Sequence, residues 1–150
     1  MHRTKAALMM ALLGALLFAA FVLQDIRNHP EIPTGELPWD LILRYAVAMT
    51  LGGALAGFVF SGLFGRQGIG GWILTMISGL IAAAVSGLIG SAIGLLPDLS
   101  AGGLSTGEIL QIAVGLLVLP LSIAEEPWLV LPVAALLIAT HVWCRAARQP

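Results

Sequence analysis

The sequence predicts an all-α integral membrane protein, with about five helical segments forming one polytopic membrane domain over residues 1–150. The first observation behind this prediction is the scarcity of charge. Only 10% of the residues are charged and 59% are hydrophobic, whereas about a quarter of the residues in a soluble globular chain are charged. The mean hydropathy is +0.98. A composition this apolar excludes a water-soluble domain and a disordered tail.

The second observation is the length of the stretches that carry no charge. A helix needs about 20 apolar residues to cross the hydrocarbon core of a bilayer. Two of the five charge-free stretches are shorter than this length, and the other three approach or exceed it. The five stretches are residues 6–24, 45–65, 67–97, 109–124 and 127–144.

The third observation is the position of the four tryptophans. Indole rings favour the headgroup level of a membrane. Each tryptophan lies at the end of a predicted segment and none lies in the middle of one: Trp39, Trp72, Trp128 and Trp143. The segment boundaries therefore have support that is independent of charge.

Charge and cysteine content exclude several classes of partner. The formal net charge is −1, so the chain has no basic face that would neutralise the phosphates of a nucleic acid. The single cysteine excludes an internal disulfide and a thiolate zinc site. We expect the lipid bilayer as a partner, and no nucleic acid, cofactor or metal ion.

The first helix is predicted over residues 6–23, after the basic start His2-Arg3-Thr4-Lys5. This pattern is shared by cleavable signal peptides and by retained signal anchors. Leu17 and Phe18 are poor matches to the small residue that a cleavage site requires. The sequence favours a retained helix with its basic end in the cytoplasm.

Residues 24–40 are the one long hydrophilic stretch and are predicted to form an external loop. Three prolines, Pro30, Pro33 and Pro38, interrupt it, and prolines at this density prevent a continuous helix. Asp40 then suits the cap of a second helix over residues 41–64.

Two further helices are predicted on either side of Pro97. The glycine-rich turn 65–71 leads into a third helix over residues 72–96, which Pro97-Asp98 ends. Ser105 and Glu108 have the spacing of a capping box, so a fourth helix is predicted over residues 106–124.

Two prolines also shape the last two predicted helices. We expect Pro120 to kink the fourth helix. Pro127 suits the first turn of a fifth helix over residues 127–143.

The number of membrane crossings stays open at four or five. With five crossings, Arg145 and Arg148 would lie outside. With four crossings, five of the seven basic residues would lie inside, which agrees better with the positive-inside rule. The segment that would not cross is 109–124, which would then be re-entrant and buried by protein.

The strongest motif is a series of small residues at every fourth position on the second and third helices. Residues four apart share one helical face, and small side chains there allow membrane helices to pack closely. We predict glycine-zipper packing of these two helices, and a homo-oligomer or a larger membrane complex as a hypothesis. The three ladders are Gly53, Gly57, Ser61 and Gly65; Gly79, Ala83, Gly87 and Ser91; and Ser78, Ala82, Ser86, Gly90 and Gly94.

Residues 51–123 resemble a known family. The matching features are Gly53-Ala54-Leu55-Ala56-Gly57, the turn 65–71, the small-residue helix from Thr75 to Gly94 and the apolar stretch 109–119. This pattern is similar to the small membrane proteins of the GlsB/YeaQ/YmgE, or "transglycosylase-associated", family. The resemblance implies a multi-pass protein of the bacterial inner (plasma) membrane that is associated with envelope stress, and it implies no enzymatic reaction.

Glu125 and Glu126 are the most suggestive polar residues, because they lie between two apolar segments. Ionisable groups at membrane depth mark ion or proton pathways. The alternative is an interfacial turn that places both carboxylates in water, and the following Pro127 favours this alternative.

The remaining polar residues form no recognisable catalytic set. Arg66 lies in a glycine-rich turn that lacks the Lys-Ser/Thr pair of a phosphate-binding loop. The three histidines have no metal-ligand spacing, and His29 with Asp25 and Glu31 suits a solvated loop. Cys144 is expected to be an interfacial thiol.

The sequence thus predicts a non-enzymatic membrane protein that supports the envelope or accompanies a larger membrane complex. The alternative is a small transporter, channel or pore-forming oligomer with Glu125 and Glu126 near its pathway.

Overall fold

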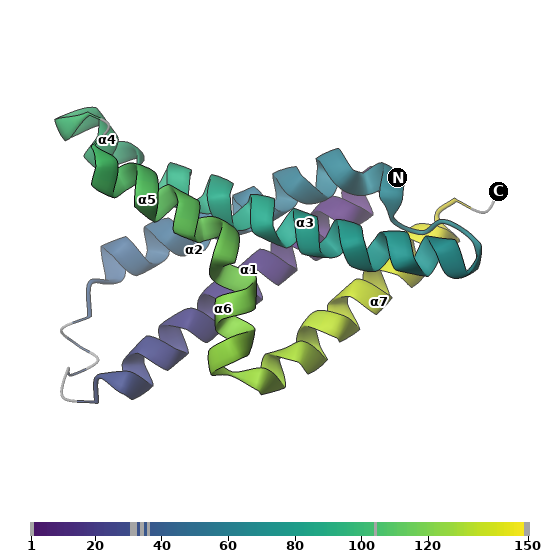
Figure 1. The fold of residues 1–150 in the computed structure, drawn as a ribbon, viewed down its shortest axis with the longest axis horizontal. Coiled ribbons are helices and arrows are strands. Elements are labelled where there is room, and N and C mark those ends of the chain that lie inside the picture. The colour runs from purple at the N-terminus through teal and green to yellow at the C-terminus, as the bar shows by residue number, and fades with distance from the viewer. Residues whose placement is uncertain (1, 31–32, 34, 36, 104, 149–150) are drawn as a thin grey trace.

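The computed structural model describes residues 2–30, 33, 35, 37–103 and 105–148. Over these residues the chain is helical with no strand, and five helices are long and apolar enough to span a membrane. The predicted fold class is confirmed. Figure 1 shows the elements: α1 (His2–Asn28), α2 (Trp39–Val59) with η2 (Phe60–Leu63), α3 (Gly68–Gly94), α4 (Leu96–Gly102), α5 (Thr106–Val114), η3 (Gly115–Leu117), α6 (Val118–Glu125), η4 (Pro127–Leu129) and α7 (Val130–Ala146).

Helix α1 is longer than the sequence predicts, at both ends. It continues through Gln24 to Asn28, so the prediction that an external loop begins at residue 24 is wrong. The first proline that blocks a helix is Pro30, and the polar residues before it continue the helical turn. Nε2 of His29 lies 3.8 Å from Oδ1 of Asp25, across one turn.

The helices on either side of the glycine-rich turn also start early. Helix α2 begins at Trp39 after Pro38, so Asp40 lies in the first turn, and the cap has no side-chain hydrogen bond. The prediction that Asp40 caps this helix is therefore wrong. Helix α3 begins at Gly68, four residues before the predicted start, because glycines 70 and 71 continue the helix.

Pro97 does not end the helical conformation as predicted. It lies in the first turn of α4, where a proline is tolerated because the first helical N–H groups have no partner within the helix. The break between α3 and α4 falls just before it, at Leu95.

The segment from Thr106 to Glu125 begins as predicted and breaks earlier than predicted. The capping box between Ser105 and Glu108 is present. The helical path changes at η3 rather than at Pro120 itself. Proline lacks an N–H and its ring clashes with the carbonyl four residues earlier, which here belongs to Leu116, inside η3.

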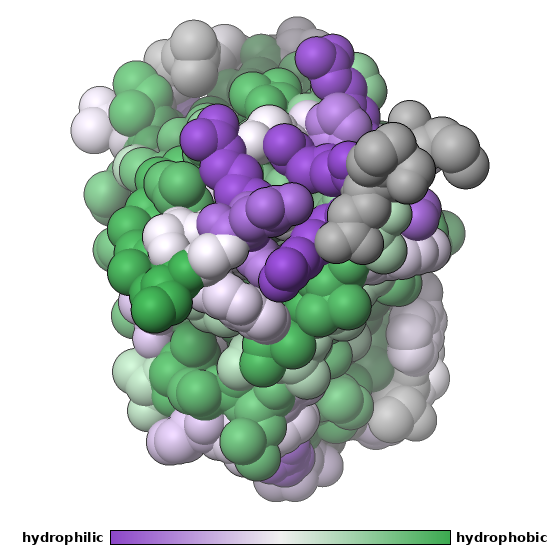
Figure 2. Space-filling model, turned by 90° about the vertical axis from the view of Figure 1, so that its right-hand side faces the viewer, coloured by the Kyte–Doolittle hydropathy of each residue, from purple (hydrophilic) through white to green (hydrophobic). Residues whose placement is uncertain are grey.

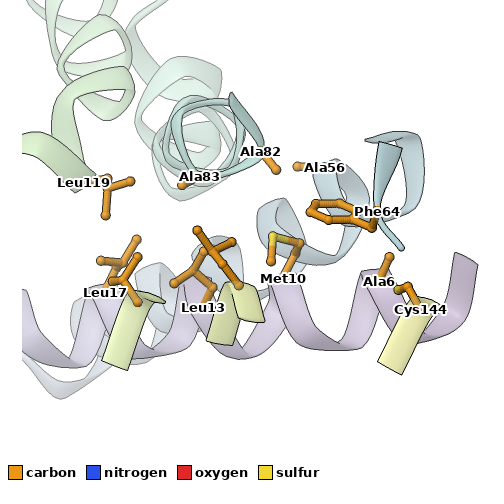
Figure 3. Close-up of a cluster of buried hydrophobic side chains, with 12 residues drawn as sticks. Ala6, Met10, Leu13, Leu17, Ala56, Phe64, Ala82, Ala83, Leu119 and Cys144 are labelled. Carbon is orange, nitrogen blue, oxygen red and sulfur yellow. The ribbon is translucent and has the colours of Figure 1, made fainter. Parts of the chain in front are cut away.

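The core lies where α1 crosses the other helices. One face of α1 contributes Met10, Leu13 and Leu17, which are at most 2% exposed. Figure 3 shows these side chains pointing toward Ala82 and Ala83 of α3, with apolar groups of neighbouring elements around them. Helix α1 packs along α2, α2 packs along α3, and α7 contacts both α1 and α3.

The two ends of this bundle differ in charge. The end that holds both chain termini (Figure 1) carries five basic residues and is called the basic end: Arg3, Lys5, Arg66, Arg145 and Arg148. The opposite end is called the acidic end. It carries two arginines and at least five carboxylates: Arg27, Arg44, Asp25, Asp40, Glu108, Glu125 and Glu126.

The segment α5–η3–α6 begins and ends beside residues of the acidic end. Gly107 and Glu108 lie with Arg44 and Leu95 around one depression. At the other end of the segment, Glu126 Oε1 accepts a hydrogen bond from Arg27 of α1 at 2.9 Å. Figure 1 shows α5 leading toward the middle of the bundle and α6 turning across its long axis. The segment therefore does not reach the basic end.

Candidate functional site

The small-residue ladder that begins in α2 at Gly53 lies against α1 and α7 of the same chain. A Cβ added to Gly53 would collide with the backbone of Met10, well inside 3.0 Å, and one added to Gly57 would lie 2.5 Å from the Ala6 carbonyl oxygen. Gly65 has a φ of 71° and lies against the backbone of α7 at Cys144 and Arg145. The fourth member of the ladder, Ser61, is buried.

The first ladder of α3 faces α7 and η3. Gly79 lies against the side chain of Leu137, and Gly87 lies against the backbone of Gly115. A Cβ on Gly115 would in turn lie 2.6 Å from the Ser91 hydroxyl oxygen. Ala83, the remaining member, is part of the core.

The second ladder of α3 mainly faces α2. The Ser86 hydroxyl donates a hydrogen bond to the Met49 carbonyl oxygen at 3.2 Å. Gly90 lies against Met49 and Gly94 against the ring of Tyr45. Ala82 and Ser78 are buried, and Ser78 bonds to a carbonyl of its own helix. These contacts are all made within one chain.

A polar pair that the sequence analysis did not identify links α3 to α7. Thr75 Oγ1 lies 2.7 Å from Nδ1 of His141, and both side chains are fully buried. The imidazole stacks on the ring of Trp72, with 3.9 Å between centroids. Nε2 of His141 has no hydrogen-bond partner among the described residues. The sequence did not predict this pair, because the two residues are 66 positions apart and neither belongs to a sequence motif.

We predict that Thr75→Val destabilises the bundle by about 1–3 kcal/mol, the cost of leaving a buried polar group without its partner. Thermal unfolding of the purified protein in detergent measures this loss. Thr50→Val is the matched control, because Thr50 bonds only to the Ala46 carbonyl of its own helix. Equal unfolding midpoints for the two variants would show that the Thr75–His141 contact contributes nothing.

Glu125 and Glu126 lie at the turn between α6 and η4 and bind side chains of α1. Glu125 accepts a hydrogen bond from Gln24. Glu126 forms an ion pair with Arg27 at 2.9 Å and accepts a hydrogen bond from Trp128 Nε1 at 2.5 Å. These contacts attach the end of α6 to α1. An ion pathway through the two carboxylates stays a prediction.

A cavity lies between α1, α2 and α5–η3 on the acidic side of the bundle. It has a volume of about 380 Å³, within the range of ligand-binding pockets in proteins. Its lining is mainly apolar: Phe18, Phe21, Val22 and Ile26 of α1, Leu41, Ile42 and Met49 of α2, and Val114 and Val118 beside η3. We call this cavity the apolar pocket.

A few polar groups also reach the apolar pocket. Asp25 contributes a carboxylate, Tyr45 a phenol, Ser91 a hydroxyl and Gln111 an amide. An apolar wall with a small number of hydrogen-bonding groups is typical of sites that bind small molecules. Sequence reasoning missed this site, because its residues come from five α-helices and η3 and share no spacing.

Of the other residues that the sequence singled out, Asp25 and Ser91 line the apolar pocket, whereas Arg66, His29 and Cys144 do not. Cys144 is buried against α1, and its Sγ lies 3.8 Å from the His2 carbonyl oxygen; its expected position at the membrane interface stays a prediction. The described residues contain no group of three or more His, Cys, Asp or Glu side chains placed to hold a metal ion. Glu31 lies outside the described residues.

No protein-family model, curated protein or solved structure matches this chain.

Proposed function

We propose that this chain is a non-enzymatic, multi-pass protein of the bacterial inner membrane that holds the hydrocarbon part of a lipid in its apolar pocket. The observation that carries the proposal is the pocket itself, about 380 Å³ and mainly apolar, between helices long enough to span a membrane. Bilayer lipids are the molecules that surround such a site.

The charge distribution supports an orientation for the proposed protein. Cytoplasmic ends of membrane proteins are enriched in Lys and Arg. Five of the seven basic residues lie at the basic end, so this end would face the cytoplasm. The apolar pocket would then lie on the side of the outer leaflet.

The polar groups of the pocket indicate which lipids suit it. Tyr45, Ser91 and Gln111 offer hydrogen bonds, and Asp25 adds a negative charge. A carboxylate in the lining disfavours an anionic headgroup beside it. The proposed occupant is therefore a neutral or zwitterionic amphiphile.

We predict that substituting Val114→Trp removes the bound lipid. Val114 lines the pocket and is 44% exposed, so an indole at this position would fill the cavity from its open side. Lipids that copurify after gentle extraction would be counted by mass spectrometry. We expect about one tightly held lipid per wild-type chain, and at least fivefold less in the variant.

Val142→Trp is the matched control, because Val142 is 54% exposed on α7 and does not line the pocket. Copurified lipid should be unchanged in this control. Equal lipid content in both variants would contradict the proposal. A foreign protein that copurifies in fixed ratio would instead favour an accessory subunit of a larger complex.

The role of the protein in the envelope rests on the family resemblance of residues 51–123 and stays a prediction. A homo-oligomer also stays a prediction. The small-residue ladders do not favour it, because their described contacts are with helices of the same chain.

A further inference from the structure

Three arginines from distant parts of the sequence surround a second cavity, at the basic end. Arg66 comes from the turn between η2 and α3, and Arg145 and Arg148 come from the end of α7. Together with Gly65 and Gln67 they line a space of about 240 Å³. Figure 2, which looks onto this end, shows hydrophilic side chains gathered in one area with apolar residues around it.

The backbone of the turn explains why these arginines meet. Gly65 has a φ of 71°, a conformation that favours glycine. It also lies directly against the backbone of Cys144 and Arg145. A side chain at this position would separate the turn from α7 and move Arg66 away from the other two arginines.

Hydrogen bonds fix two of the guanidinium groups on the same carbonyl. Arg148 donates to the Gly62 carbonyl oxygen at 2.9 Å, and Nε of Arg66 donates to it at 3.2 Å. Arg148 also donates to the Ser61 carbonyl oxygen at 3.2 Å. A guanidinium carries five N–H donors, so these bonds orient each group and leave further donors for a ligand.

No carboxylate among the described residues balances this charge. The Arg27–Glu126 ion pair and the contact between His29 and Asp25 lie at the acidic end. The cavity also adjoins the start of α3, where Gln67 provides no side-chain cap. The partial positive charge of a helix N-terminus there adds to that of the arginines.

We propose that this arginine-lined cavity binds a phosphate group. Arginine is suited to phosphate because its planar donors match two oxygens at once. The volume of about 240 Å³ fits a headgroup and not a whole lipid, and the cavity lies at the basic end of the bundle. The same chemistry recognises the phosphate of an acidic phospholipid and free inorganic phosphate.

The test compares two double variants with equal loss of charge. Arg66→Gln/Arg145→Gln removes two arginines of the cavity and keeps Arg148, which holds the carbonyls. Arg3→Gln/Lys5→Gln removes two basic residues of the same end whose side chains lie over Phe58 and Trp143 instead. Binding of short-chain phosphatidylglycerol, phosphatidylcholine and inorganic phosphate to each full-length protein in neutral detergent is measured by native mass spectrometry.

We expect wild type to prefer phosphatidylglycerol over phosphatidylcholine, and Arg66→Gln/Arg145→Gln to weaken its binding about tenfold or more, in line with the loss of charge-assisted hydrogen bonds. The Arg3→Gln/Lys5→Gln control should change it less than threefold. If inorganic phosphate competes with phosphatidylglycerol, the site accepts a soluble phosphate ligand. If inorganic phosphate does not compete, the ligand is the headgroup of a lipid.

An equal effect of both double variants would overturn the proposal, because it would indicate diffuse attraction by the whole basic end. The proposal would also be overturned if the wild-type protein bound neither phosphatidylglycerol nor inorganic phosphate. If Arg66→Gln/Arg145→Gln fails to fold, Arg145→Gln compared with Arg3→Gln makes the same distinction. The apolar pocket is untouched by these substitutions, so this result is independent of the proposed lipid site there.

Discussion

Replacing Gly53 and Gly87 together with alanine is expected to lower the midpoint of thermal unfolding by about 10 °C or more. A Cβ at either position would lie well inside 3.0 Å of backbone atoms, at Met10 in one case and at Gly115 in the other. Backbone cannot move aside as a flexible side chain can, and overpacking of this kind costs about 1–3 kcal/mol per site. The sites have no shared partner, so their effects should add.

Gly70→Ala is the control for this measurement. Gly70 belongs to α3 and has nothing within 4 Å of the position where a Cβ would lie. Alanine favours helix over glycine by roughly 0.5–1 kcal/mol, so this variant should unfold at the wild-type temperature or slightly above it. A double variant as stable as Gly70→Ala would show that the helices can separate at both sites without cost.

The second large effect concerns which side of the membrane each end of α5–η3–α6 faces. Single cysteines at Gly107, Pro127 and Gln67 would be introduced in a Cys144→Ser background and treated with a membrane-impermeant maleimide on intact spheroplasts. Because the segment begins and ends beside residues of the acidic end, we expect Gly107→Cys and Pro127→Cys to be labelled alike. Gln67→Cys, at the basic end, should react only after the membrane is permeabilised.

This experiment distinguishes four crossings from five. A segment that crosses would place Gly107→Cys and Pro127→Cys on opposite sides, so that only one of them reacts from outside. Cys144→Ser without a new cysteine gives the background of labelling. Labelling of all three positions in intact spheroplasts would indicate a leaky preparation, which a cytoplasmic marker enzyme detects and excludes.

The membrane class and the approximate helix positions were predictable because they depend on local composition. Charge-free length identifies a spanning helix wherever it packs, and the capping box at Ser105 and Glu108 is encoded within four residues. Helix ends were less predictable. The start of α3 at Gly68 shows why, because glycines 68, 70 and 71 resemble a turn in sequence and continue a helix in the folded chain.

The sites could not be predicted, because each combines residues that are distant in the sequence. Arg66 and Arg148 meet on the carbonyl of Gly62 only because α7 returns to the basic end. His141 has no feature in sequence that separates it from a solvated histidine, yet it is fully buried beside Thr75. The path of α6 across the bundle depends on where Pro120 disturbs the preceding turn, η3, which lines the apolar pocket with α5.

The contact between the first and last helices has a consequence for biosynthesis. Cys144 lies beside the His2 carbonyl oxygen, 142 positions away, and the Lys5 ammonium lies over the ring of Trp143 at 5.2 Å. Helices α1, α2 and α3 emerge from the ribosome first and can associate in that order. The side of α1 that α7 covers then stays open until α7 has been synthesised. A nascent chain that stalls before α7 would therefore expose this surface to the insertion machinery and to membrane proteases.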